Sequence, residues 1–473
     1  MSLLRRTTDL ADLLLGSTRR VRRWEYLLTG VVLLAVKFVG DSWILRRGAG
    51  RTLTLEAFLD PVWSLGGTPL DRLPSNVGWA LVCWTVAFLW IAVSMSVRRS
   101  VSAGFSPAWG LLVLAPVLKV PTVLALCIAR DDDLATASPS RDPARRLQLE
   151  LERERLARPG TVDAAKGRTL LIASLLGLLA GAVAIAASVI FAKLYGLALF
   201  LLAPVVAGFV IGFTLNRDET LRLGKTVGIA SWVVALGLIF MLAAGAEGAL
   251  CLLMASPIVL VLAAIGALVG RSAALCGGRP RDAGIALALL PLLTGLEARW
   301  PAASPPIEVR SEILIHATPE AIWPHVVSFP ELPPADDWLF RESIADPRRA
   351  TIAGEGVGAV RRCEFSTGPF IEPITAWEPP TRLAFDVTAQ PRPMRELSPW
   401  GEIDAPHLDG YLRAQRGEFR LEPVDATTTR LVGSTWYELD IQPLAYWRLW
   451  SDAFIHAIHM KVLRHIAAQV EPH

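Results

Sequence analysis

TVGIASWVVALGLIFMLAAGA, residues 226–246, has no charged side chain across its 21 positions. A helix needs about 20 apolar residues to cross roughly 30 Å of hydrocarbon, so this stretch is long enough to span a membrane. Three neighbouring runs have the same character and cover residues 169–192, 194–216 and 248–270. Because a buried soluble core is a poor explanation for four such runs in succession, the sequence predicts a transmembrane helical bundle.

Three earlier apolar stretches are less regular than these four. They cover residues 27–45, 77–97 and 109–128. Lys37 and Asp41 interrupt the first stretch, and Lys119 interrupts the third. A charged side chain at membrane depth is costly, so these residues either snorkel to the headgroups or line a polar site between helices.

Two segments decide how many times the chain crosses. Pro116 and Pro121 break the stretch 109–128, which we interpret as a re-entrant hairpin. A final apolar run, residues 283–296, is only about 21 Å long at 1.5 Å per residue. If it crosses, the domain that follows lies outside the cytoplasm, and if it lies on the membrane surface, that domain lies inside. The bundle is predicted to have about seven or eight membrane segments.

Basic residues predict the orientation of the bundle. Arginines cluster at residues 19–23, nine basic residues lie within 130–168, and the loops 217–225 and 271–281 hold three each. Basic loops stay in the cytoplasm, so all four segments are expected there. Within the longest of them, residues 147–156 are charged and typical of a solvated helix.

Charge and cysteine spacing argue against several functions. The net charge of +3 is scattered along the chain and offers no basic patch for nucleic acid. The five cysteines show neither a CxxC pair nor metal-ligand spacing, so neither a disulfide framework nor a redox centre is indicated. We therefore predict no cofactor and no nucleic-acid partner.

The composition changes after the last apolar run. PAASPP, residues 301–306, is typical of a stiff linker, and all seven histidines follow it. Alternating apolar positions predict strands over 307–315, 359–365, 370–377, 382–387, 417–421 and 429–439. Thr318 and Pro319 predict the start of a short helix, and apolar residues at spacings of four predict a long terminal helix over 445–470. This order predicts an α+β domain whose antiparallel sheet wraps a long C-terminal helix.

The predicted organisation is therefore multi-domain. The domains are an N-terminal membrane domain (1–130), a charged cytoplasmic linker or helix (131–167), a second transmembrane helix group (168–300), the Pro-rich linker (301–306) and a soluble domain (307–473). These boundaries follow the changes in hydropathy and charge along the chain.

Four motifs in the soluble domain carry a resemblance to a known family. They are ATPEAIW (317–323), GVGAVRRCEF (356–365), WEP (377–379) and TRLVGSTWY (429–437). With them, residues 307–471 resemble the polyketide cyclase/dehydrase and START-like (SRPBCC) superfamily of helix-grip domains. The resemblance implies an apolar cavity between the sheet and the C-terminal helix, in which lipids, sterols, polyketides or hormones bind. It implies no shared catalytic motif, so it predicts a ligand-binding domain and no particular reaction.

A second resemblance concerns the N-terminal membrane domain. RRWEY (22–26) and the pair Arg98-Arg99 with Trp109 resemble a family of small bacterial inner-membrane proteins of unknown function. Ala103 departs from that family, which usually has an acidic residue there. The resemblance implies a bacterial inner-membrane location and supplies no chemistry.

The strand 359–365 provides the first candidate ligand residues. Alternation places Arg361 and Cys363 on the same face of this strand. An arginine in an otherwise apolar row either binds an anionic ligand or pairs with a buried carboxylate, for which Glu372 on the next strand is suitable.

Tyr437 and two histidines provide further candidates for the ligand cavity. Tyr437 either presents its hydroxyl to the cavity or bonds within the core. His456 and His459 are three residues apart and share a helix face, which suits a proton-transfer pair, two metal ligands or hydrogen bonds to the sheet. Because the sequence has no HExxH motif and no evident third ligand, we predict no metal site.

The segment 388–415 is long, irregular and rich in proline. Met394, Trp400 and Tyr411 are apolar residues held among those prolines, so we predict a lid over the cavity mouth; a packed surface excursion is the alternative. His407 in the same segment is a further candidate for the cavity.

The sequence supports three hypotheses about function. The first is a membrane-anchored binding protein whose helix-grip domain holds a hydrophobic small molecule or lipid near the bilayer. The second is a cyclase or dehydratase that uses His407, His456 or Tyr437 as acid and base. The third is a transport or assembly protein with a regulatory soluble domain. The first hypothesis, which is not an enzyme, is favoured, with the bilayer and an apolar ligand as the partners.

Overall fold

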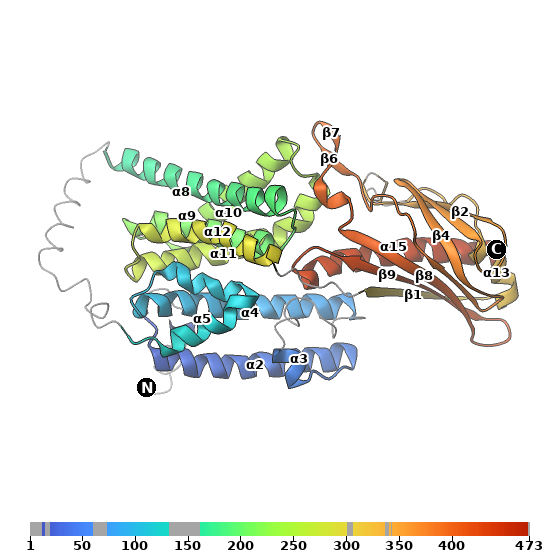
Figure 1. Ribbon diagram of the computed structural model, residues 1–473, viewed down its shortest axis with the longest axis horizontal. Coiled ribbons are helices and arrows are strands. Elements are labelled where there is room, and N and C mark those ends of the chain that lie inside the picture. The colour runs from blue at the N-terminus through green and yellow to red at the C-terminus, as the bar shows by residue number, and fades with distance from the viewer. Residues whose placement is uncertain are drawn as a thin grey trace, which may run out of the picture. The chain divides into compact units, whose positions relative to one another are not determined.

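The chain is described here by a computed structural model (Figure 1). It describes residues 12–14, 19–59, 73–131, 161–299, 306–335, 340–341 and 343–471. The predicted charged helix at 147–156 and most of the 301–306 linker lie outside these ranges.

The chain divides into two compact units, which we call the helical unit and the grip unit. The helical unit comprises Met1–Ser64, Ala80–Phe240 and Ala255–Pro301. The grip unit comprises Leu65–Trp79, Met241–Met254 and Ala302–His473. The grip unit therefore includes short pieces from the ends of helices as well as the C-terminal domain.

Helices make up the described part of the chain before residue 300. They are α2 (Arg23–Ala49), α3 (Leu55–Leu59), α4 (Ser75–Ser102), α5 (Pro116–Ile128), α8 (Thr161–Ile185), α9 (Ala203–Arg217), α10 (Leu223–Ala243), α11 (Ala249–Leu275) and α12 (Arg281–Arg299). Among the described residues, six helices are long and apolar enough to cross a membrane. They cover Arg23–Ala49, Asn76–Ser102, Lys166–Phe191, Ala198–Arg217, Leu223–Ala243 and Ala249–Leu275. The prediction of a bundle of apolar helices of membrane-spanning length is confirmed, and α12 and the proline-broken stretch account for its higher count of segments.

The proline-broken stretch forms two short helices. A 3-10 helix over Pro107–Leu114 is followed by α5, and Ala115 between them has an extended backbone. Proline at the first position of α5 suits that position because its fixed φ matches a helix. The break therefore lies at Pro116, whereas Pro121 lies inside α5, and a re-entrant hairpin stays a prediction.

Helices α9 and α11 approach each other backbone to backbone. A Cβ added at Gly208 would lie 2.0 Å from the carbonyl oxygen of Ala263, and one added at Gly270 would lie 2.0 Å from that of Phe209. Glycine at these positions permits a contact that any side chain would block, as small residues do in membrane helices.

Several charged residues in the described part of the helical unit bond to neighbours. Lys37 Nζ donates to Asp41 Oδ2 over 2.7 Å, so these two residues pair along α2, whereas Lys119 is exposed on α5. Arg98 and Arg99 are fully buried. Arg98 donates to the carbonyl of Leu13, and Arg99 donates to the carbonyl of Leu126. These arginines join segments that are distant in the sequence.

The C-terminal domain contains a seven-stranded antiparallel sheet in the order β1-β9-β8-β5-β4-β3-β2. Its strands are β1 (Ile307–Ile315), β2 (Pro347–Ala353), β3 (Val360–Phe365), β4 (Gly368–Glu378), β5 (Arg382–Asp386), β8 (Leu412–Pro423) and β9 (Thr429–Leu439). The helix α13 (Pro319–Val327) follows β1, and α15 (Leu444–Val470) ends the domain and runs along the sheet (Figure 1). The predicted α+β helix-grip fold is confirmed.

Details of the domain differ from the prediction. The strand β2 was not predicted, and neither was the hairpin of β6 (Glu396–Ser398) and β7 (Gly401–Ile403). Thr318 lies at the N-cap of α13, but its side chain makes no capping hydrogen bond. Pro319 at the first helical position and Glu320 in the first turn remain favourable for a helix start.

The C-terminal part of α15 closes one end of the domain. Val462, Leu463 and Ile466 are buried against Ile315 and Leu431 of the sheet. The middle of α15 is less covered, because Phe454 and Ile458 remain partly exposed. The domain is therefore tightly packed at one end and more open toward the middle of its long helix.

Candidate functional site

Arg361 and Glu372 form a buried ion pair between adjacent strands. They are register partners on β3 and β4, and their exposed fractions are 2% and 5%. Arg361 Nε also donates to the carbonyl of Val327 over 3.2 Å. Three rings lie within 5.4–5.7 Å of its guanidinium carbon, those of Phe329, Phe385 and Phe419.

This geometry is that of the second role predicted for Arg361, in which the arginine pairs with a buried carboxylate. Burial raises the pKa of Glu372, and the nearby guanidinium of Arg361 opposes that effect. Cys363 lies on the same face of β3, and burial raises the pKa of its thiol to about 12. The thiol therefore stays protonated at neutral pH and is a poor nucleophile. A ligand role for the three residues stays a prediction.

Tyr437 is fully buried and bonds to α15. Its hydroxyl donates to Asp452 Oδ1 over 2.7 Å, and Arg448 Nε donates to Asp452 Oδ2 over 2.9 Å. Burial, followed by the charge of Asp452, raises the pKa of Tyr437 well above its ordinary value. Tyr437 thus bonds to a side chain of the terminal helix, and its role toward a ligand stays a prediction.

His456 and His459 meet hydroxyl groups of the sheet. Ser311 Oγ lies 2.7 Å from Nδ1 of His456 and 3.1 Å from Nδ1 of His459. Thr435 Oγ1 lies 2.8 Å from Nε2 of His459. Burial, together with the neighbouring His456, lowers the pKa of His459 to about 4. These contacts have the geometry of one of the three predicted roles, in which the histidines hydrogen-bond the helix to the sheet.

The predicted lid residues lie in different surroundings. Met394 forms a β-bridge with Ile344. Trp400, at the turn between β6 and β7, is 79% exposed, and its Nε1 donates to the carbonyl of Ala243 over 2.6 Å. The backbone carbonyl of Tyr411 accepts from the N–H of Asp440. Closure over a cavity stays a prediction, but the β6–β7 turn contacts the end of α10.

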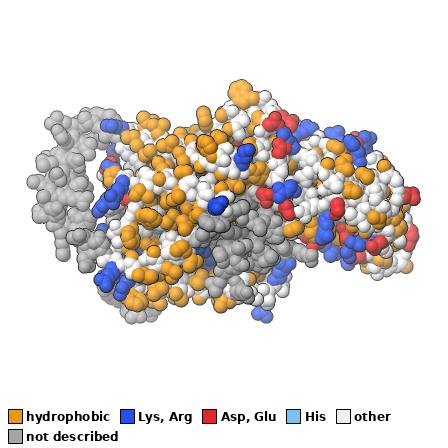
Figure 2. Space-filling model, in the orientation of Figure 1, with side chains coloured by type: hydrophobic (Ala, Val, Ile, Leu, Met, Phe, Trp, Pro, Cys, Tyr) orange, Lys and Arg blue, Asp and Glu red, His pale blue; other side chains and the backbone are white. Residues whose placement is uncertain are grey.

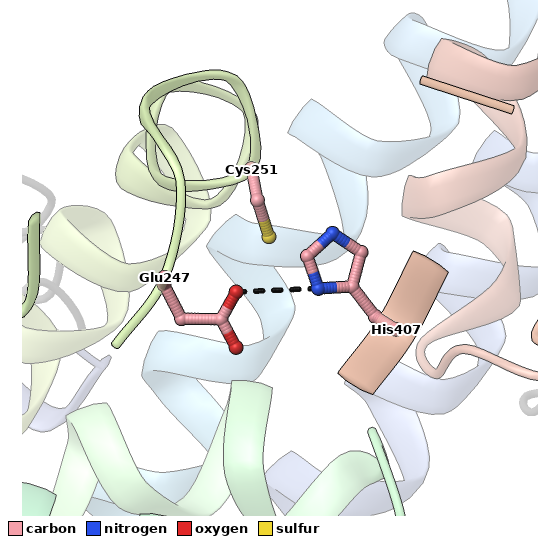
Figure 3. A group of neighbouring side chains, drawn as sticks. All are labelled: Glu247, Cys251 and His407. Atoms are coloured by element: carbon pink, nitrogen blue, oxygen red, sulfur yellow. Dashed lines mark ion pairs between the residues drawn. The ribbon is translucent and has the colours of Figure 1, made fainter. Parts of the chain in front are cut away.

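His407 lies in a buried cluster that the sequence did not predict (Figure 3). Its Nδ1 is 3.2 Å from Oε2 of Glu247, and its Nε2 is 3.3 Å from Oε1 of Glu396. Cys251 completes the group: the potential ligand atoms of Glu247, Cys251 and His407 all lie within 4.8 Å of one another. All four side chains belong to the grip unit and are nearly inaccessible to solvent.

Local structure explains how this cluster is assembled. A short 3-10 helix over Pro406–Leu408 presents His407, and the first turn of α11 carries Cys251. Glu396 Oε1 accepts from the backbone N–H of Cys251 over 3.0 Å, a favourable place for a carboxylate near a helix N-terminus. A Cβ added at Gly248 would lie 1.9 Å from Glu396 Oε2, so glycine is needed for this approach.

Opposing effects act on His407. Burial lowers its pKa, but hydrogen bonds to Cys251, Glu247 and Glu396 outweigh burial and raise the pKa of His407 to about 12. In the absence of another cation the imidazole is therefore protonated and balances part of the carboxylate charge.

The structure thus separates the predicted site residues into distinct groups. Arg361, Cys363 and Glu372 lie together, His456 and His459 lie together, and Tyr437 and His407 each have other partners. Sequence reasoning missed Glu247, Cys251 and Glu396. One local signal was present, because Glu247 is a single acidic residue between two long apolar runs.

The fold and these clusters define a class of protein: a helical bundle of membrane type that is joined to a helix-grip domain. The family described as polyketide cyclase / dehydrase and lipid transport matches residues 306–471. This match confirms the predicted resemblance of the C-terminal domain. The predicted resemblance of the N-terminal part is not among the matches and stays a prediction.

Several solved structures are similar to the C-terminal domain. Norcoclaurine synthase from Thalictrum flavum is 12% identical, with 36% of this chain and 97% of that chain covered and a TM-score of 0.25. A protein from Nitrosospira multiformis is 19% identical, with 35% and 96% covered and a TM-score of 0.23. The Zhui aromatase/cyclase from Streptomyces sp. R1128 is 14% identical, with 35% and 94% covered and a TM-score of 0.23. No curated protein matches the chain.

Proposed function

We propose that this protein is a membrane-anchored binding protein whose helix-grip domain holds a hydrophobic small molecule or lipid. The observation that carries the proposal is an apolar interior that is only partly covered. Phe365 and Phe370 on the interior face of the sheet are partly exposed, as are Phe454 and Ile458 on α15. Partly exposed aromatic and aliphatic side chains on the sheet and on the long helix are the kind of lining that an apolar ligand needs.

The segments that make up the grip unit support a function at the membrane. This unit includes residues from the ends of three candidate membrane helices, namely α4, α10 and α11. The hydroxyl of Tyr446 at the start of α15 donates to the carbonyl of Met254 on α11. Trp79 of α4 packs edge-on against Tyr446, with the ring centroids 6.0 Å apart. A domain held in this way has a high effective concentration toward molecules dissolved in the bilayer.

The same contacts support an assignment of sidedness. Counting crossings from the basic residues 19–23 places the connections after α2 and after α10 outside the cytoplasm. Parts of both connections belong to the grip unit, so the C-terminal domain is assigned to the non-cytoplasmic side and α12 to a crossing helix. Arg46 and Arg47 in the last turn of α2 and Arg51 after it are the exception to the charge rule. We assign the protein to a bacterial inner membrane, as the resemblance of RRWEY and Arg98-Arg99 implies.

The surface of the helical unit fits a lipid environment. Figure 2 shows hydrophobic side chains gathered over the helices, while charged side chains are frequent over the C-terminal domain. Exposed apolar residues on these helices include Leu28, Val32, Phe191, Trp232 and Phe240. Contiguous apolar surface of this extent is unusual on a soluble protein and is expected where lipid covers it.

The ligand proposal is tested on the full chain in detergent. We expect mass spectrometry of organic extracts to find a co-purified lipid or other apolar molecule, and we expect a fluorescent fatty-acid analogue to bind. Ile458→Trp fills the partly covered interior and should weaken binding of the probe about tenfold or more, which corresponds to 1.4 kcal/mol. Ala453→Trp, on an exposed position of the same helix, is the matched control and should bind normally. Equal binding by wild type and Ile458→Trp would contradict the proposal.

Sidedness is tested by reporter fusions in a bacterial host. Alkaline phosphatase joined after Glu471 should be active, and a green fluorescent protein at the same place should be dark. Both reporters inserted at Glu219, in a basic loop, should give the opposite result. A fluorescent C-terminal fusion would place the domain in the cytoplasm and reject the assignment.

A further inference from the structure

A cluster outside the helix-grip interior has the composition of a metal site. It joins Glu247 and Cys251, which are four residues apart, to His407, which lies more than 150 positions further along the chain. We propose that Glu247, Cys251 and His407 bind a divalent transition metal ion of the zinc type, with Glu396 as the group that orients His407.

The donor atoms select the class of metal. A thiolate, an imidazole nitrogen and a carboxylate oxygen suit zinc, whereas magnesium and calcium prefer oxygen ligands alone. With metal–ligand bonds of about 2.0–2.3 Å, donors on one zinc ion lie about 3–4 Å apart. Here the three donors lie within 4.8 Å of one another, and Glu247 Oε2 is 3.2 Å from His407 Nδ1. Small side-chain rotations bring all three into coordination distance.

Glu396 supplies the support that metal-bound histidines usually have. A histidine that ligates through one ring nitrogen normally donates its other N–H to a carboxylate or carbonyl, which sets the tautomer. Glu396 Oε1 is 3.3 Å from Nε2 of His407, leaving Nδ1 toward Glu247. The same carboxylate accepts from the backbone N–H of Cys251. One residue therefore holds two of the three ligands in place.

Burial of charge supports the same assignment. Glu396 is fully buried, and Glu247 and His407 are each 7% exposed. Glu247 and Glu396 both lie within 3.3 Å of the imidazole, so a cation at this place would enter a site that already holds two acidic side chains. A divalent cation would displace the protons of the imidazole and of the thiol when it binds. With three protein ligands, a tetrahedral ion keeps a fourth position for water or another ligand.

The ion would link two segments of the grip unit. Glu247 and Cys251 lie on and next to the connection from α10 to α11, and His407 follows the β6–β7 hairpin. The site is independent of the partly covered interior, so it can hold metal whether or not the domain binds an apolar ligand.

Metal binding by the full-length protein is the first test. The protein is purified in detergent, stripped with a chelator and titrated with Zn²⁺ alone. One equivalent should bind. Co²⁺ in place of Zn²⁺ should give the near-ultraviolet charge-transfer absorption of a cobalt–thiolate bond. Failure of the folded wild-type protein to bind Zn²⁺, or a Co²⁺ complex without that absorption, would overturn the proposal.

Variants locate the ion. Cys251→Ser should lose the cobalt–thiolate absorption, and Glu247→Gln should weaken Zn²⁺ binding by more than the roughly 10–100-fold expected for the outer residue in Glu396→Gln. Cys83→Ser removes an exposed cysteine elsewhere and should bind as wild type does. Retention of the absorption in Cys251→Ser would refute the site.

A measurement on the wild type covers the case in which Cys251→Ser fails to fold. Zn²⁺ should slow alkylation of Cys251 relative to the chelator-treated protein, as read by peptide mass spectrometry, and should leave alkylation of Cys83 unchanged. An equal rate at Cys251 with and without Zn²⁺ would again overturn the proposal.

Discussion

Two groups of buried charged side chains in the grip unit differ in the partners that surround the cation. At Arg361 and Glu372 one cation meets one carboxylate, and a backbone carbonyl and three aromatic rings surround the guanidinium. At His407 one imidazole meets two carboxylates and a thiol. Burial is common to both, so burial alone does not indicate a ligand site. The set of donor atoms does, because only the second group brings a thiol, an imidazole and a carboxylate within 4.8 Å of one another.

Breaking the balanced pair should have the largest effect. Glu372→Ala leaves the buried guanidinium of Arg361 without its carboxylate, and we expect a loss of about 3–5 kcal/mol in the stability of the C-terminal domain. Thermal unfolding of the full chain in detergent, followed by fluorescence, measures it. The double variant Arg361→Met, Glu372→Leu should recover most of that loss. A Glu372→Ala variant as stable as wild type would show that the ion pair does not stabilise the domain as expected.

Adding Zn²⁺ should distinguish the His407 cluster from the Arg361–Glu372 pair. Zn²⁺ at a hundred times its dissociation constant should stabilise the wild type by about 2.7 kcal/mol, since it binds the folded chain preferentially. The melting temperature of Cys251→Ser should not respond. A Zn²⁺ response of equal size in both proteins would remove the contrast between the two groups.

The pair of His456 and His459, of which His459 is partly buried, offers a third case. The pKa of His459 is lowered from 6.5 to about 4 in the folded chain, so between these pH values the unfolded chain binds a proton that the folded chain does not bind. Stability should therefore be fully present above pH 6.5 and fall by roughly 1–3 kcal/mol as the pH drops toward 4. Unfolding as a function of pH measures this, and His459→Gln should flatten the profile in that window. An unchanged profile in the variant would assign the acid sensitivity to other groups.

The smallest effect is expected at Tyr437. Tyr437→Phe removes one hydrogen bond to Asp452, which keeps its ion pair with Arg448. The expected loss is about 0.5–1.5 kcal/mol, measured by thermal unfolding. A loss of several kcal/mol would mean that the hydroxyl also organises the start of α15.

Much of the fold follows from local patterns. The strands 307–315 and 429–439 were predicted with their observed bounds, and the predicted terminal helix begins within one residue of α15. Alternation and helical periodicity report the burial of neighbouring residues, and this information is carried by the sequence itself. The hairpin of β6 and β7 was missed because its strands are only three residues long and show no period.

The candidate sites depended on partners that periodicity does not reveal. The pairing of Arg361 with Glu372 was an alternative in the sequence because both lie on adjacent strands. The neighbours of His407 were not, since Glu247 and Cys251 belong to a helix connection distant in the chain. Similarly, the close contact of Gly208 and Gly270 depends on which helices pack together.

The sequence by itself determined that apolar helices of membrane length precede a soluble α+β domain, because hydrophobic length and period are local properties of the chain. Tertiary structure alone decided which charged groups share a buried site. Electrostatic balance is set by distances of a few ångströms between residues that the chain order keeps apart, and folding creates those distances.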